Sequence, residues 1–160
     1  MITTFSPVTI IKFVNIFRDL AISKLTSEDF IIGGKNIICE IDESKFKKYG
    51  DFWVVDREAP TLRRIIKQHV KPKSIVHTDY WKGYSHLDQL NIIHCRVNHS
   101  KNRIQHGTGV HTNNVEGLWQ GVKLNISTRN RSEHLLKKHL NEFVWRRKYR
   151  DNYLILLLIY

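Results

Sequence analysis

The sequence predicts an α/β domain, in which strands alternate with helices. Short runs of β-branched apolar residues alternate along the chain with segments whose apolar residues recur at helical spacing. The 160 residues are enough for one domain with its own hydrophobic core. The composition, 41% hydrophobic and 26% charged, excludes a disordered tail or a fibrous chain. No apolar run reaches the roughly 18 residues of a membrane span, so we expect no membrane partner.

The first elements precede residue 60. Ser6-Pro7 is typical of a helix start, and apolar residues at helical spacing predict an amphipathic helix over 7–25. Gly33-Gly34 breaks this pattern, so residues 1–32 form an expected N-terminal helical segment. A β-branched run predicts a buried strand within 36–46, and residues 52–55 predict a second, very short strand.

The later elements follow from the same two periodicities. They are a helix over 62–70 ended by Pro72, a strand over 74–78, a short helix over 84–90, a strand over 92–97, a polar loop over 98–111, a helix from Asn113 or Asn114 to Ile126, and a helix from Ser132 to the basic cluster at 146–148. Residues 151–160 are expected to form an apolar C-terminal tail.

The positive charge is concentrated in the last third of the chain. The formal net charge is +11, and residues 117–150 hold 9 basic and 2 acidic side chains, whereas residues 1–60 hold 8 and 9. Such a field attracts a phosphate backbone at any sequence, so nucleic acid is the first expected partner. The candidate contacts are Lys123, Arg146, Arg147 and Lys148. The alternative is that these basic helices are only solvated faces.

Three acids stand at the ends of predicted elements. Asp42 and Asp79 each follow an apolar strand, Glu116 opens a helix, and each is 37 positions from the next. Carboxylates that converge repel one another unless a cation neutralises them, which favours Mg²⁺ or Mn²⁺. Two such ions could support an in-line phosphoryl transfer. The alternatives are turn or capping aspartates in water, and a first-turn glutamate that interacts favourably with the helix dipole.

Four segments carry a family resemblance. They are EIDESKF at 40–46, HTDYWKGY at 77–84, VNHS at 97–100 and HTNNVEGLW at 111–119. In this order they resemble the catalytic domain of Merlin-type transposases and their ISXO-like bacterial insertion-sequence relatives, over about residues 10 to 150.

This resemblance implies a ribonuclease-H-like mixed sheet flanked by helices over residues 33–150, with a DDE triad of Asp42, Asp79 and Glu116. It implies cut-and-paste DNA transposition with Mg²⁺ or Mn²⁺ held by the triad, and transposon ends and target DNA as partners. We also expect a homodimer, located in the nucleus of a eukaryote or in the cytoplasm and nucleoid of a bacterium.

The chain departs from this family between the first acidic strand and the following helix. Only residues 47–60 stand where members have a full hairpin of strands 2 and 3, so the hairpin is truncated. We therefore expect one edge of the strand that carries Asp42 to be left open, and whether the chain is an active enzyme stays undecided. The alternatives are a catalytically inactive or host-adopted DNA-binding protein and a ribonuclease-H-like nuclease.

Four other side chains have two interpretations each. Trp81, Tyr84 and Trp119 could stack on unpaired bases, or they could belong to the core. His111 could contact DNA or the scissile phosphate, or it could be bonded to backbone.

Overall fold

The computed structural model describes residues 5–44, 58–98, 109–130, 132–148 and 155–159. The α-helices are α1 (Pro7–Ile22), α2 (Ala59–His69), α3 (Asn113–Asn125) and α4 (Glu133–Lys148), and the strands are β1 (Ile38–Ser44), β2 (Ile75–Asp79), β3 (Ile93–Val97) and β4 (Ile155–Ile159). The predicted alternation of strands and helices is confirmed, so the domain is α/β.

Two local predictions need correction. The short helix expected over 84–90 is a pair of 3₁₀ turns, Lys82–Tyr84 and Leu87–Gln89, because His86 between them adopts a left-handed conformation with φ of 64°. The helix expected to be capped by Asn113 or Asn114 has Thr112 at its N-cap.

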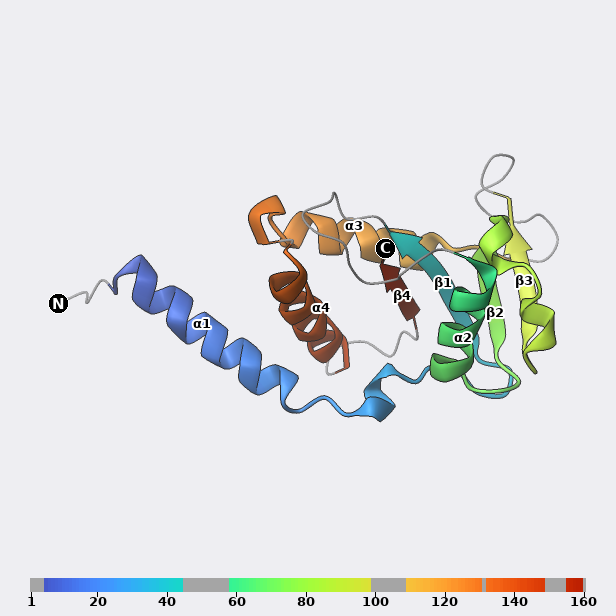
Figure 1. The fold of residues 1–160 in the computed structure, drawn as a ribbon, viewed down its shortest axis with the longest axis horizontal. Helices are drawn as coiled ribbons and strands as arrows, with labels where there is room; N and C mark the ends of the chain where they lie inside the picture. The colour runs from blue at the N-terminus through green and yellow to red at the C-terminus, as the bar shows by residue number, and fades with distance from the viewer. Residues whose placement is uncertain (1–4, 45–57, 99–108, 131, 149–154, 160) are drawn as a thin grey trace.

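The four strands form one sheet in the order β3-β2-β1-β4, and all three pairings are parallel (Figure 1). The antiparallel part of the predicted mixed sheet is therefore not seen among the described residues. The strand predicted at 52–55 lies outside them, as does most of the 47–60 hairpin.

The apolar end of the chain contributes a strand to this sheet. Within the expected tail, β4 pairs with β1 from Glu40 opposite Ile155 to Ser44 opposite Ile159. A continuous apolar run of this kind is typical of strands in parallel sheets. The prediction that one edge of the Asp42 strand is open was wrong, because β2 lies on one side of β1 and β4 on the other.

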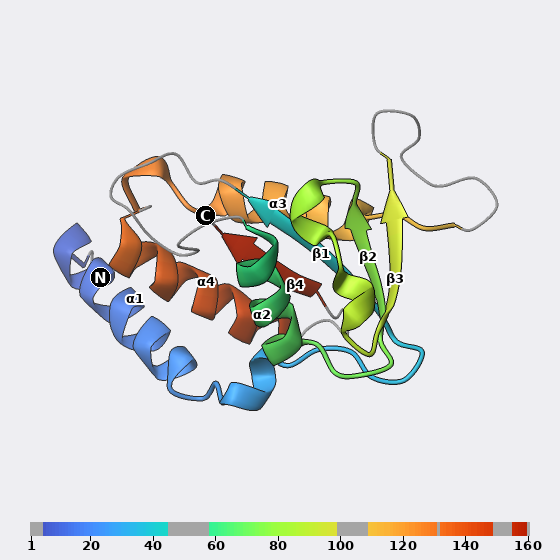
Figure 2. The same cartoon turned by 45° about the vertical axis from the view of Figure 1, so that its right-hand side comes forward.

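Helices cover both faces of the sheet. In Figure 2, α2 lies in front of the sheet and α3 lies behind it. The α2 face holds the main hydrophobic cluster, made by Ile32, Cys39, Ile41, Leu62, Ile66, Val70, Val76, Tyr84 and Leu87. The other face of β1 contacts α3.

A second hydrophobic cluster joins α3 to α4. Its buried members are Val115, Trp119, Val122, Ile126 and Leu136. Through these contacts α4 is anchored to the helix that begins beside the sheet.

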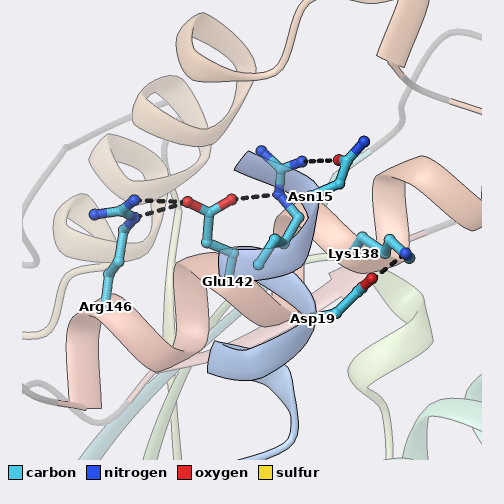
Figure 3. Close-up of polar contacts among 6 residues, drawn as sticks. Asn15, Asp19, Lys138, Glu142 and Arg146 are labelled. Atoms are coloured by element: carbon cyan, nitrogen blue, oxygen red, sulfur yellow. Dashed lines mark hydrogen bonds and ion pairs between the residues drawn. The ribbon is translucent and has the colours of Figure 1, made fainter. Parts of the chain in front are cut away.

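Helix α1 packs on α4, and polar side chains join the two helices (Figure 3). Arg18 Nε lies 2.6 Å from a carboxylate oxygen of Glu142, and Lys138 Nζ lies 2.7 Å from Asp19. Most of the large apolar side chains of α1 are exposed. None of the described helices has the length and apolar character needed to cross a membrane.

Candidate active site at the carboxyl ends of β1 and β2

The register of β1 and β2 explains the 37-residue spacing of two predicted site residues. Ile38 lies opposite Ile75, and Glu40 lies opposite His77, so paired residues differ by 37 positions. Asp42 and Asp79 differ by the same number, and the register continued by two residues places them level. Parallel strands end at the same edge of a sheet. The two carboxyl ends therefore present the two aspartates side by side.

Alternation along the strands places these aspartates on the face that α3 covers. Glu40 of β1 contacts the start of α3, and His77 of β2 contacts His111, two positions before the first residue of that helix. Side chains two positions apart in a strand share a face. Asp42 and Asp79 thus share this face with Glu40 and His77.

The electrostatics of Asp42 bring the third acid into the same site. Burial, and after it the negative charges of Glu43, Asp79 and Glu116, together raise the pKa of Asp42 to about 7. Charges act strongly only over short distances. The structure therefore places Asp42 within electrostatic reach of both Asp79 and Glu116.

Local contacts orient two of these carboxylates. Asp79 Oδ1 accepts the backbone N–H of Trp81 at 2.9 Å, which fixes the carboxylate in the turn after β2. Glu116 Oε1 lies 3.4 Å from the hydroxyl of Thr112, which donates to it.

The donor set fits a hard divalent cation in part. Among the described residues, no group of three or more His, Cys, Asp or Glu side chains is placed to hold a metal ion by itself. Mg²⁺, however, is usually bound by one or two carboxylates together with waters and substrate phosphates. Burial and then neighbouring acids raise the pKa of Asp42, and a cation would neutralise the negative charge of those acids. The residues fit an ion whose coordination is completed by water and phosphate.

Glu40 is a buried site residue that the sequence reasoning missed. Its side chain is only 5% exposed, and its Oε2 accepts the backbone N–H groups of Asn114 and Val115, each at 3.0 Å. Its Oε1 accepts the side-chain amide of Asn114. The available signal was an acid two positions before Asp42 within an apolar strand, which places both on one face.

Two histidines lie beside Glu40. His77 donates its Nδ1–H to the carbonyl of His111 at 3.2 Å, and the two rings meet edge to face. Burial lowers the pKa of His77 below its ordinary value, which favours the neutral ring. His111 Nδ1 lies 3.4 Å from Glu40 Oε1. The predicted phosphate contact His111 therefore packs at the start of α3.

The predicted DNA-binding residues lie at the ends of two different helices. Lys123 is in the last turn of α3 and is exposed. Arg146, in α4, binds Glu142, which also accepts a hydrogen bond from Arg18 (Figure 3). Lys148 Nζ lies 2.7 Å from Asp29, and the side chain of Arg147 lies outside the described residues.

The ion pairs of Glu142 in α4 stabilise its charged form. Burial alone would raise the pKa of Glu142, but the hydrogen bonds from Arg18 and Arg146 outweigh it and lower that pKa. Arg146 is nevertheless mostly exposed. A phosphate could therefore reach Arg146 only in competition with Glu142.

The aromatic residues are largely structural. Tyr84 and Trp119 are buried in the two hydrophobic clusters, which confirms their core interpretation. Trp81 is half-buried, packs on the same core as Tyr84 and meets its ring edge to face. The hydroxyl of Tyr84 donates to Glu43, and burial raises the pKa of Tyr84 well above its ordinary value.

Comparison with known proteins gives a family. The family model described as an ISXO2-like transposase domain matches residues 32–148, which include the three acids and run from β1 to the end of α4. An uncharacterized transposase-like protein of Haemophilus influenzae is 33% identical over 91 residues, covering 56% of this chain and 72% of that protein. No solved structure matches. The resemblance seen in the four sequence segments is confirmed.

Proposed function

Because the chain belongs to the family of ISXO2-like transposase domains, we propose that it is a DDE transposase-like protein that moves DNA by divalent-metal-dependent phosphoryl transfer. One observation carries the proposal beyond the family. The parallel register of β1 and β2 sets Asp42 level with Asp79, on the face where α3 begins with Glu116 in its first turn. A cut-and-paste reaction needs such an acidic site beside a surface that attracts DNA.

Asp42, Asp79 and Glu116 are the proposed ligands of Mg²⁺ or Mn²⁺. The ion would activate a water or a 3′-hydroxyl and stabilise the leaving oxygen. The protein's part is to hold the acids in place. The N–H of Trp81 orients Asp79, and the strands on both sides of β1 fix the backbone at Asp42.

Lys123, Arg146, Arg147 and Lys148 are the proposed contacts to the DNA backbone. The excess of basic side chains in 117–150 supports this role, because such contacts release counterions from the duplex. Arg146 and Lys148 would exchange their protein carboxylates for phosphates. Binding should therefore be weakened by salt.

A DNA-binding protein without catalysis is the second candidate. The observation that favours it is the lack, among residues the structure describes, of three acidic, His or Cys side chains placed to share a metal ion. An acidic site that does not gather around a metal would leave DNA binding intact and chemistry absent.

The deciding experiment is cleavage of duplex DNA that carries the repeats flanking the gene, with Mn²⁺ or Mg²⁺. We expect the wild-type chain to cleave it, and Asp79→Asn to lower the rate at least about 100-fold without changing DNA affinity. Asp88→Asn, at an exposed position, is the matched control and should cleave like wild type. Equal cleavage by wild type and Asp79→Asn would exclude the acidic site.

A DNA-binding measurement in the same samples separates the two candidates. Binding without cleavage by any variant supports the inactive DNA-binding protein. Cleavage of an RNA–DNA hybrid in place of the repeat duplex would indicate the nuclease alternative. Where the chain binds DNA, replacing Arg146, Arg147 and Lys148 with Ala should flatten the slope of log DNA affinity against log salt concentration. The control Lys67→Ala, on α2, should leave this slope unchanged.

A further inference from the structure

Glu40 connects the central strand to a distant helix. It lies in β1, its side chain is almost fully buried, and its partners Asn114 and Val115 lie more than 70 positions along the chain. A buried carboxylate is costly unless hydrogen bonds satisfy it. Here three hydrogen bonds, all from the first turn of α3, do so.

The helix does not cap itself in the usual way. Thr112 is the N-cap residue, but its side chain makes no capping hydrogen bond to the backbone and instead donates to Glu116. Asn114 and Val115 are the second and third helical residues, whose N–H groups an N-cap side chain normally satisfies. Glu40, which lies in β1, accepts these two N–H groups in place of an N-cap side chain. Its negative charge also interacts favourably with the positive end of the helix dipole.

This contact bears on the geometry of the site. Glu116 follows Val115 in the same turn, and its N–H donates to the carbonyl of Thr112 at 3.1 Å. Asp42 lies two residues beyond Glu40 on the same face of β1. The hydrogen bonds of Glu40 therefore join the segment that carries one acid to the segment that carries another.

We propose that Glu40 is a positioning residue that holds the first turn of α3 on β1 and thereby sets where the Glu116 carboxylate lies relative to Asp42 and Asp79. The catalytic half of this inference rests on the proposed function, whereas the structural half does not. Glu40 is no ligand in this scheme, because both of its oxygens are occupied by donors of α3.

The variant Glu40→Gln tests the contact without changing the volume of the side chain. Its amide keeps one acceptor oxygen but turns an NH₂ group toward donors of α3, so at least one hydrogen bond is lost. For the NMR readout, Glu142→Gln is the matched control, since Glu142 is also a part-buried, hydrogen-bonded glutamate but contacts α1.

Amide exchange and NOEs measured by NMR give the first readout, which needs no activity. In Glu40→Gln we expect the Asn114 and Val115 amides to exchange at least about tenfold faster relative to Val122 in the same helix. We also expect weaker NOEs between the first turn of α3 and β1. Unchanged exchange or unchanged NOEs in this variant would overturn the proposal.

Metal binding and kinetics give the second readout. With Mn²⁺ alone, Glu40→Gln and Glu116→Gln should lose the same part of the metal-induced rise in melting temperature, and the double variant should lose no more. In the cleavage assay, Glu40→Gln should lower kcat about 100-fold and leave KM for DNA unchanged, since a misplacement of about 1 Å has such an effect.

The outcomes separate this inference from the proposed function. Faster exchange with wild-type kcat and a wild-type Mn²⁺ response would show a helix cap without a positioning role, and would overturn the inference. A wild-type chain that neither cleaves DNA nor responds to Mn²⁺ would remove the proposed function. The NOEs between α3 and β1 would then still decide whether Glu40 sets the place of Glu116.

Discussion

The two faces of β1 have different roles, although residues of the two faces alternate along the strand. Toward α2, Cys39 and Ile41 are completely buried among apolar side chains. Toward α3, Glu40 is satisfied by the helix start, and Asp42 lies near two other acids. Burial stabilises the first face, whereas it raises the pKa of Asp42 on the second. Because successive side chains of a strand point to opposite faces, one face of β1 stabilises the core and the other carries the candidate site.

The largest expected effect is on the apolar face. Ile41→Ala should lower the free energy of unfolding by about 2–5 kcal/mol, because it leaves a cavity in the core under α2. Ile38→Ala is the matched control, since Ile38 is in the same strand but is 54% exposed on the α3 face. It should cost less than about 1 kcal/mol. Urea denaturation measures both, and equal losses would contradict the comparison.

A smaller effect, of opposite sign, is expected on the acidic face. The pKa of Asp42 in the folded chain, about 7, is above its ordinary value of 3.8, so the folded state binds the proton more tightly. The stability that protonated Asp42 contributes to the wild-type fold is therefore lost as the pH rises from about 4 to about 7.

The variant Asp42→Asn removes this loss. It should be more stable than wild type at pH 8, and the difference between their urea midpoints should shrink as the pH falls toward 5. Taking the difference cancels other titrating groups such as His77 and His94, whose pKa values burial lowers. A wild type that is more stable than Asp42→Asn at pH 8 in metal-free buffer would contradict this sign.

The smallest expected effect concerns the two thiols. Burial raises the pKa of Cys39 to about 11, while Cys95 of β3 is only half-buried. Because the thiolate is the reactive form, iodoacetamide at pH 8 should alkylate Cys95 at least about tenfold faster. The two rates should become equal in urea, and Ile41→Ala should speed the labelling of Cys39. Mass spectrometry of the labelled peptides gives both rates, and faster labelling of Cys39 in the native chain would reverse the comparison.

Local patterns predicted most of the fold. β-branched runs located the three strands that carry or flank the acids, and helical spacing located all four helices, because both signals reside in adjacent residues. The pairing of β4 with β1 was missed, because an apolar run does not specify which strand it joins. The turn at His86 was missed because a left-handed histidine has no signal in periodicity.

The sequence predicted the three acids of the candidate site, but not the residues that hold neighbouring segments and side chains in place. The equal spacing of Asp42, Asp79 and Glu116 was visible, but its meaning as a strand register required the pairing itself. Glu40 was missed because its partners are distant in sequence and become neighbours only when α3 docks on the sheet. Arg146 was predicted from charge alone, which does not show that Glu142 binds it.

The pairing of β4 with β1 also has a consequence for the order in which the sheet forms. Glu40 and Ile155 are paired although 115 positions separate them, so this contact closes a very long loop. Non-local pairing of this kind slows folding. During synthesis, β4 can pair with the strand that carries Asp42 only after the ribosome has released residues 155–159. A strand edge that waits for its partner in this way is a template for aggregation.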